Sequence, residues 1–152
     1  MDYKVESFLL DHTKVQAPYV RKAATIVGPK GDIITKFDLR FLQPNQDTLP
    51  TGAVHTLEHL ISTYLREEIE NVVDLSPMGC RTGFYLVMLE DAEAEKIEKA
   101  LIKVLEKVVV TSEVPAMTAK ECGNYRDHSL FGAQEYAKLV LDGFTKQKKA
   151  GA

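Results

Sequence analysis

Two histidines and a glutamate stand close together in the sequence, at His55, Glu58 and His59. The apolar residues around them recur at the spacing of a helix, at Val54, Leu57, Ile61 and Leu65. Residues four positions apart share one helix face, so both imidazoles can bind one metal ion, with Glu58 beside it as a proton-transfer group. A solvated helix face would show the same spacing, and the order His-x-x-Glu-His is also that of the inverzincin peptidases.

Both cysteines of the chain stand where a thiol can be reactive. Cys122 directly follows Thr118-Ala-Lys-Glu121, a capping box that predicts a short helix with the thiol in its first turn. Cys80 follows Gly79 in a turn, at the edge of a predicted strand. A buried cysteine that acts only as a small apolar residue is the common alternative.

Three candidate ligands, His55, His59 and Cys122, favour a catalytic metal site over a structural one. Structural zinc sites usually have four protein ligands, drawn in close pairs from local turns. The sequence shows no obvious fourth, since His128 is more typical of a hydrogen-bonded structural histidine. Three ligands leave one position for water or a substrate oxygen.

Glu58 and Cys80 are the candidate proton-transfer groups at this metal. A Lewis acid with two such groups suits enolisation, in which the metal polarises a carbonyl while a base removes the adjacent proton. Hydrolysis, with Glu58 activating a water molecule, is an alternative that gives Cys80 no role. A non-catalytic protein with a structural metal is a further alternative, and it requires a fourth protein ligand.

The elements that must position these residues indicate an α+β fold. Strands are predicted at residues 19–27, 33–42, 72–75 and 84–89. Helices are predicted at residues 51–71, 92–110 and 133–146, after a short helix or arm at the N terminus. A turn at 28–32 joins the first two strands into a hairpin. We expect one domain over residues 1–152, in two layers, with a mostly antiparallel sheet and about three helices packed on one face.

Composition excludes several classes of protein. The chain has 152 residues, 45% hydrophobic and 27% charged, as in ordinary globular proteins. A net charge of -3 gives no footprint for nucleic acid, and no apolar run approaches the roughly 20 residues that span a membrane. The first residues are too charged for a secretory signal, so we expect a cytoplasmic protein with reduced thiols.

Six stretches spread over almost the whole chain follow the motif order of a known enzyme family. These are residues 7–8, 11–15, 37–41, 55–59, 76–85 and 121–128. With these six motifs together and a similar length, the sequence resembles the S-ribosylhomocysteine lyases of the LuxS type. These bacterial enzymes make the precursor of the autoinducer-2 quorum signal.

The resemblance implies roles for the candidate metal ligands and proton-transfer residues. His55, His59 and Cys122 would hold one divalent ion per subunit, ferrous iron in the native state and often zinc after isolation, without an organic cofactor. Cys80 and Glu58 would be the acid/base pair. The implied reaction moves the carbonyl of S-ribosylhomocysteine from C1 to C3 of the ribose. A β-elimination then releases homocysteine and leaves 4,5-dihydroxy-2,3-pentanedione.

The resemblance also implies a substrate site and a partner. Ser7, His12, Arg40 and Asp74 would bind substrate, although the strand pattern alone places Arg40 on the less apolar face, as a solvated arginine. Family members are homodimers with active sites at the subunit interface, where the N-terminal arm reaches the partner's site. Arg81 departs from the neutral residue that is common in the family, and its charge should favour a thiolate at Cys80.

Overall fold

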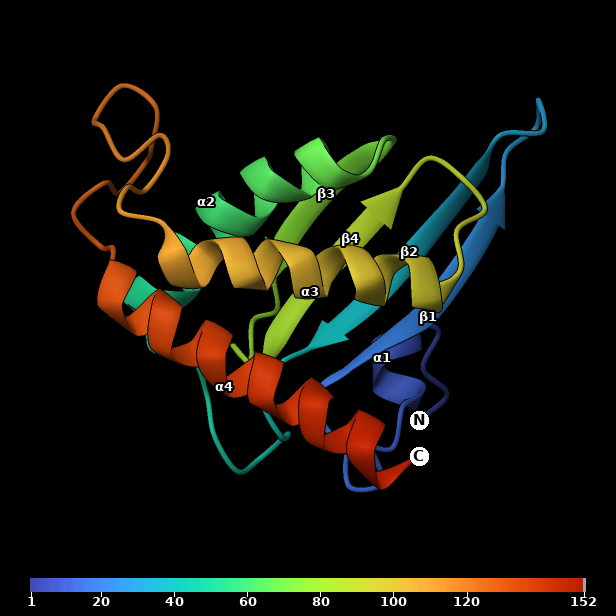
Figure 1. Ribbon diagram of the computed structural model, residues 1–152. Helices are drawn as coiled ribbons and strands as arrows, with labels where there is room; N and C mark the ends of the chain where they lie inside the picture. The colour runs from blue at the N-terminus through green and yellow to red at the C-terminus, as the bar shows by residue number, and fades with distance from the viewer. Residues whose placement is uncertain (152) are drawn as a thin grey trace.

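The computed structural model describes residues 1–151 (Figure 1). The elements in chain order are α1 (Glu6–Leu9), β1 (Tyr19–Val27), β2 (Ile33–Arg40), α2 (Thr51–Glu68), β3 (Val72–Pro77), β4 (Gly83–Met88), α3 (Ala94–Val110) and α4 (Leu130–Ala150). The α+β class is confirmed, and all four strands and three main helices lie close to their predicted ranges.

The four strands form one antiparallel sheet in the order β1-β2-β4-β3. The predicted hairpin of β1 and β2 is confirmed. Gly31 closes its turn, donating its N–H to the carbonyl of Gly28 at 3.0 Å with a φ of +91° that favours glycine. β3 and β4 form a second hairpin, and the turn between them carries Cys80.

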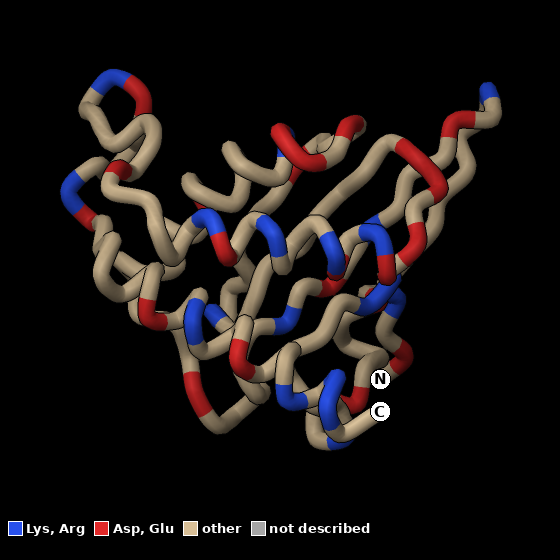
Figure 2. Tube along the Cα trace, in the orientation of Figure 1, with Lys and Arg blue, Asp and Glu red and all other residues tan. Residues whose placement is uncertain are grey.

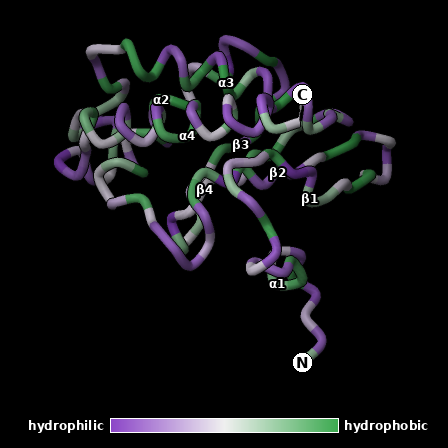
Figure 3. Tube along the Cα trace, turned by 60° about the horizontal axis from the view of Figure 1, so that its bottom comes forward, coloured by the Kyte–Doolittle hydropathy of each residue, from purple (hydrophilic) through white to green (hydrophobic). Residues whose placement is uncertain are grey.

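The helices α2, α3 and α4 cover one face of this sheet, whereas α1 lies on the opposite side (Figure 3). Alternate residues of the strands therefore point into the space between sheet and helices. The fully enclosed side chains there include Phe37, Leu39, Phe84, Leu86, Met88, Leu57, Leu60, Ile61, Leu101 and Leu105. This core fixes the orientation of α2 and, with it, the histidines that α2 carries.

Two helices depart from their predicted ends. α2 ends at Glu68 rather than near Asn71, because Ile69 is already extended and Asn71, with a φ of 65°, turns the chain into β3. α4 starts at Leu130, three residues before its predicted start. Ser129 caps it, because its Oγ accepts the N–H of Gly132 at 3.0 Å.

The outer face of the sheet carries a buried charge network. Arg40 is only 1% exposed, and it donates from Nε and Nη2 to the carboxylate of Asp38 at 3.1 and 3.0 Å. Arg21 donates to the same carboxylate at 3.1 Å and to Glu6 of α1 at 2.5 Å. The expectation of a solvated arginine at position 40 is wrong, because Asp38, two residues earlier on the same strand face, supplies the opposite charge.

Charged residues of both signs lie along the rest of the chain. Acidic and basic residues are interspersed along α3 and around the sheet edges (Figure 2). Within residues 1–151, no helix combines the length and the apolar character that a membrane span needs.

Candidate metal centre and catalytic cavity

The N-terminal half of α2 presents two histidines to the loop that joins α3 and α4. His55 and His59 lie one turn apart, with ring centroids 4.8 Å from each other. Cys122 comes from the loop, and its Sγ lies 3.4 Å from Nε2 of His55 and 3.9 Å from Nε2 of His59. The structure therefore brings together the three predicted ligands, although Cys122 stands 67 and 63 residues after His55 and His59 in the sequence.

Hydrogen bonds fix the tautomer of both histidines. Nδ1 of His55 donates to the carbonyl of Asp127 at 2.8 Å, and Nδ1 of His59 donates to the carbonyl of Pro115 at 2.7 Å. A carbonyl oxygen can only accept, so each ring carries its proton on Nδ1 and a lone pair on Nε2. Both lone pairs belong to the atoms nearest Cys122, which is the arrangement of metal-binding histidines.

The loop around Cys122 forms one turn rather than the predicted short helix. The capping contact is present, because Thr118 Oγ1 accepts the N–H of Glu121 at 3.2 Å, and the N–H of Cys122 bonds to the Thr118 carbonyl at 2.9 Å. The helix does not continue, since turns follow from Gly123 onward. The prediction of a helix is therefore wrong beyond this one turn, and the carbonyls of Pro115 and Asp127 on either side of it accept hydrogen bonds from the histidines of α2.

His128, for which the sequence favours a hydrogen-bonded structural role, lies beside this group. The ligand atoms of His55, His59, Cys122 and His128 all lie within 4.8 Å of one another. Nδ1 of His128 is 2.9 Å from Oγ1 of Thr56, and its ring stacks on His55 with centroids 3.9 Å apart. Burial, together with the neighbouring His55 and His59, lowers the pKa of His128.

The donor spacing fits a metal ion held by three of these residues. With metal–sulfur and metal–nitrogen bonds of tetrahedral zinc, sulfur and nitrogen lie about 3.6 Å apart and two imidazole centroids about 5 Å apart. The distances from Cys122 and the 4.8 Å between the rings of His55 and His59 match these values. Nε2 of His128 also lies 3.8 Å from Sγ of Cys122, but its ring stacks on that of His55 with centroids 3.9 Å apart, closer than those of two ligands of one tetrahedral ion.

Glu58 lies between the two histidines in sequence, on α2, and is half-buried. Among residues 1–151, its carboxylate has no hydrogen bond within the chain and no ion pair. A carboxylate next to a metal centre and not engaged elsewhere can accept or deliver a proton.

Cys80 lies in the turn between β3 and β4. Its thiol lines a cavity of about 300 Å³ with Ser7, His12 and Arg40, and none of the histidine–cysteine cluster lines it. Nδ1 of His12 donates to the carbonyl of Leu10 at 2.9 Å, which leaves Nε2 as an acceptor. Three of the four predicted substrate-binding residues therefore share one cavity with the predicted catalytic thiol.

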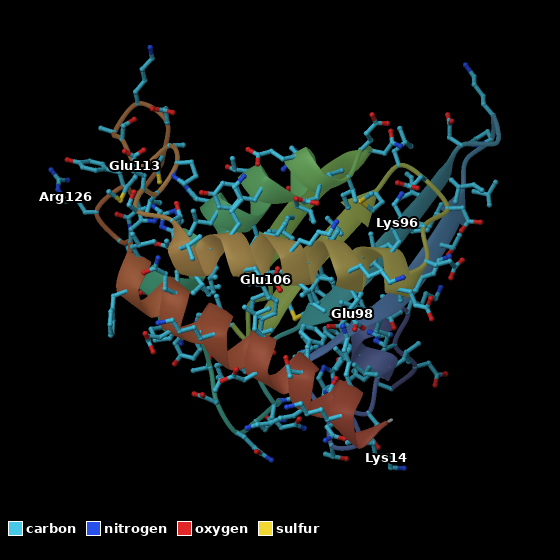
Figure 4. All side chains as sticks on the ribbon, viewed as in Figure 1. Lys14, Lys96, Glu98, Glu106, Glu113 and Arg126 are labelled. Atoms are coloured by element: carbon cyan, nitrogen blue, oxygen red, sulfur yellow. The ribbon has the colours of Figure 1, made fainter. Side chains whose placement is uncertain are left out.

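Asp74 is the predicted substrate residue that the structure does not bring to this cavity. It lies exposed on β3, where its carboxylate accepts the hydroxyl of Ser76 at 2.5 Å. The residues that line the cavity and those of the metal-binding cluster form separate sets. Arg126, in the cluster loop, and Lys14, just after α1, lie at different ends of the molecule (Figure 4).

Two further residues lie near these sites, and the sequence pointed to only one of them. His128 was considered as a ligand, and its bond to Thr56 fits the hydrogen-bonded structural histidine that the sequence favoured. Thr82, which lies between Arg40 and Cys80, carried no signal, since a threonine near the start of a strand is ordinary.

Fold and site together define a small α+β protein with a helix-borne histidine–cysteine metal centre and a separate cavity that holds a free thiol. The family model described as S-ribosylhomocysteinase (LuxS) matches residues 5–150. The chain therefore belongs to the LuxS family.

Several S-ribosylhomocysteine lyases are similar to this chain over nearly their whole length. The chain is 61% identical over 143 residues to the S-ribosylhomocysteine lyase of Clostridioides difficile (strain 630), which covers 93% of this chain and 95% of the relative. It is 59% identical over 140 residues to the S-ribosylhomocysteine lyase of Enterococcus faecalis (strain ATCC 700802 / V583), covering 91% of each. The enzyme of that name from Clostridium botulinum (strain Alaska E43 / Type E3) is 57% identical over 143 residues, with 93% and 95% covered.

Proposed function

We propose that this protein is a metal-dependent carbon–sulfur lyase that cleaves S-ribosylhomocysteine to homocysteine and 4,5-dihydroxy-2,3-pentanedione, the autoinducer-2 precursor. The observation that carries the proposal is the donor set of His55, His59 and Cys122, with both imidazole lone pairs fixed towards the thiol. The relatives named for this activity are 50% or more identical over most of the chain, which supports the same substrate.

Three protein ligands, His55, His59 and Cys122, are proposed to hold one divalent ion. Thiolate and imidazole donors suit ferrous iron and zinc, and we propose ferrous iron as the native metal. Bound there, the ion supplies Lewis acidity that makes a carbon next to a carbonyl more acidic. A ferrous ion and two free cysteines require reducing conditions, so we place the protein in the bacterial cytoplasm.

Glu58 and Cys80 are proposed to move the protons of the reaction. Carbonyl migration along the open-chain sugar needs a group that removes a proton from one carbon and returns one to its neighbour. With the carbonyl at C3, loss of the C4 proton lets the pair of electrons left on carbon expel the C5 thioether sulfur as homocysteine. A carboxylate and a thiolate, each able to act as acid and base, suffice for these steps.

The cavity of Ser7, His12 and Arg40 is proposed to bind the polar parts of the substrate. Arg40 lines it with a charge that Asp38 holds in place, and His12 offers an acceptor nitrogen. Asp74 is proposed as a further substrate residue, although it lies outside this cavity in the single chain.

A homodimer is proposed to complete the site, because one chain separates Cys80 from the metal ligands. The outer face of the sheet bears no long helix, and α1 beside it exposes Phe8 and Leu9 by 61% and 66%. Exposed apolar residues of this kind mark interaction surfaces. In such a dimer, the cavity of one protomer would face the metal centre of its partner.

The direct test is the release of free thiol from S-ribosylhomocysteine by anaerobically purified, iron-loaded protein. We expect turnover by the native protein and its loss in Cys80→Ala and in Glu58→Ala. Cys80→Ala with one full equivalent of bound metal is the matched control, since it separates loss of the thiol from loss of the ion. Native protein that holds its metal yet releases no thiol would exclude the lyase.

The ring of His128 favours one competing function, a non-catalytic protein whose metal has four ligands. That function makes His128→Ala lose the metal together with the fold. The lyase proposal instead expects His128→Ala to keep one equivalent of metal, because its ring stacks on a ligand rather than replacing one.

A further inference from the structure

Thr82 stands between a buried cation and the thiol of the cavity. It is 4% exposed, and it comes two residues after Cys80 and one before β4. Its Oγ1 lies 3.0 Å from Nη1 of Arg40 and 3.1 Å from Sγ of Cys80. One hydroxyl group therefore connects the guanidinium to the sulfur.

The direction of these two hydrogen bonds follows from the donors and acceptors present. A guanidinium has only donors, so Oγ1 of Thr82 must accept the proton of Arg40. The hydroxyl proton of Thr82 stays available for another acceptor, and the sulfur of Cys80 is within reach. Donation to a thiolate is a charge-assisted hydrogen bond, which is much stronger than any bond between this hydroxyl and a neutral thiol.

The charge of Arg40 strengthens that donation. Burial opposes the ionised form of Arg40, but the hydrogen bonds and charge of Asp38 outweigh it and raise the pKa of the guanidinium. A hydroxyl whose oxygen accepts from a cation becomes a better donor through its own proton, since the members of a hydrogen-bonded chain polarise one another.

The turn that carries Cys80 is held from several sides. Arg81 takes a φ of 58°, a left-handed conformation that is uncommon for a residue with a side chain. Its N–H bonds to the carbonyl of Met78 at 2.9 Å, and Thr48 Oγ1 donates to the carbonyl of Cys80 at 3.0 Å. The backbone on both sides of Cys80 is thus fixed, and Thr82 adds the contact that fixes the sulfur.

We propose that Thr82 is a positioning residue for Cys80, whose hydroxyl links Arg40 to the sulfur and stabilises the thiolate in the cavity. Its importance for turnover rests on the proposed function, in which Cys80 transfers protons. The hydrogen-bonded chain itself does not depend on any substrate, so it can be tested without one.

The test compares Thr82→Val, which keeps the shape and removes the hydroxyl, with Thr82→Ser, which keeps the hydroxyl. Metal-loaded protein is treated with iodoacetamide from pH 5 to pH 10, and mass spectrometry follows the peptides of Cys80 and Cys122 separately. A hydrogen bond to a charged group changes an equilibrium by about tenfold or more. The less stabilised thiolate is the stronger nucleophile, which offsets part of that change.

We expect Thr82→Val to slow alkylation of Cys80 at neutral pH by about threefold to tenfold. The difference between the two rates should narrow towards pH 10, and Thr82→Ser should stay within about twofold of the native protein. Equal rates for Thr82→Val and the native protein would overturn the proposal. A slowing that persists unchanged at pH 10 would also overturn it, because altered access rather than ionisation would then be responsible.

If Thr82→Val does not fold, the native protein alone can still test whether the thiolate of Cys80 is stabilised. Its Cys80 should react at neutral pH at least about threefold faster than the same peptide in the denatured chain. An equal or lower rate in the folded protein would refute a stabilised thiolate. A native protein that shows the expected alkylation of Cys80 but does not cleave S-ribosylhomocysteine would count against the lyase reaction. It would not count against the hydrogen-bonded chain.

Discussion

Asp38 is the residue on which the outer face of the sheet depends. It is fully buried, and it accepts hydrogen bonds from Arg40, Arg21 and the hydroxyl of Tyr19. This carboxylate is shared by two arginines, of which Arg21 also pairs with Glu6 and Arg40 lines the cavity. Breaking a buried ion pair from one side leaves a charge without water or a partner, which is more costly than never having the pair.

We expect Asp38→Asn to lower the free energy of unfolding by about 3 kcal/mol, because Arg40 would remain buried without its counter-charge. Urea unfolding followed by circular dichroism measures the change. Asp91→Asn is the control, since Asp91 pairs with Lys22 at the exposed surface and should change the unfolding curve little. Equal effects of the two variants would show that burial of the network adds nothing.

Tyr19 reports on the same network through its ionisation. Burial and its hydrogen bond to Asp38 raise the pKa of Tyr19 from 10.0 to about 12. Because the folded value is the higher one, the stability that this group contributes is complete below pH 10. That stability is lost as the pH rises towards about 12.

In a spectrophotometric titration, one of the six tyrosines should therefore ionise about two pH units above the ordinary value for tyrosine. Asp38→Asn should move this late phase downward, and Tyr19→Phe should remove it. A late phase that survives Tyr19→Phe would belong to another tyrosine.

At the scale of elements, α2 and the loop between α3 and α4 are joined by the metal-binding groups. The loop reaches α2 through the carbonyls of Pro115 and Asp127, which accept from the two ligand histidines. Ser129 adds a backbone bond to Gly52, near the start of α2, at 3.1 Å. The core of sheet and helices does not involve these contacts.

Removing the metal with a chelator should loosen this loop and leave the fold intact. Amide hydrogen exchange should rise in residues 112–128, while α3 and the strands keep their protection and far-ultraviolet circular dichroism stays unchanged. His59→Ala should behave like the chelated native protein, since it lacks one ligand and one anchor of the loop. Cooperative unfolding on chelation would instead indicate a structural metal.

Gly83 sets how closely β2 and β4 approach. A Cβ built at this position would lie 2.1 Å from the carbonyl oxygen of Leu39, which is part of the facing strand. We expect Gly83→Ala to lower the free energy of unfolding by at least about 2 kcal/mol, because the backbone must shift to admit the methyl group. Gly79→Ala, with open space at its Cβ, is the matched control and should change stability little. Similar losses in both variants would contradict this reason.

The sequence predicted the helices and strands, which depend on neighbouring residues. It did not predict the surroundings of side chains whose contacts come from distant parts of the chain. Apolar periodicity placed α2 and α3 within a few residues, and spacing alone placed His55 and His59 on one helix face. The environment of Arg40 could not be predicted from its strand pattern, because burial there depends on α1 and on a carboxylate shared with another arginine. The partner of His128 could not be predicted either, because Thr56 lies on α2, 72 residues earlier.

At the scale of the whole molecule, the two groups of residues come from different elements. α2 and the loop before α4 hold the metal-binding cluster, whereas Ser7 of α1 lines the cavity with Cys80 and Arg40. The proposed reaction uses both groups, and we propose that a second chain brings them together. In a two-fold dimer, each surface meets the other surface of its partner, so two complete sites form at once.

The most direct measurement is thiol release from S-ribosylhomocysteine by a heterodimer of Cys80→Ala and Glu58→Ala chains, co-expressed with two tags and purified through both. Each homodimer of these variants should be inactive. The heterodimer should recover about half of the native activity, because one of its two sites then contains both an intact Cys80 and an intact Glu58. A heterodimer as inactive as its parents, beside active native protein, would contradict a site built from two chains.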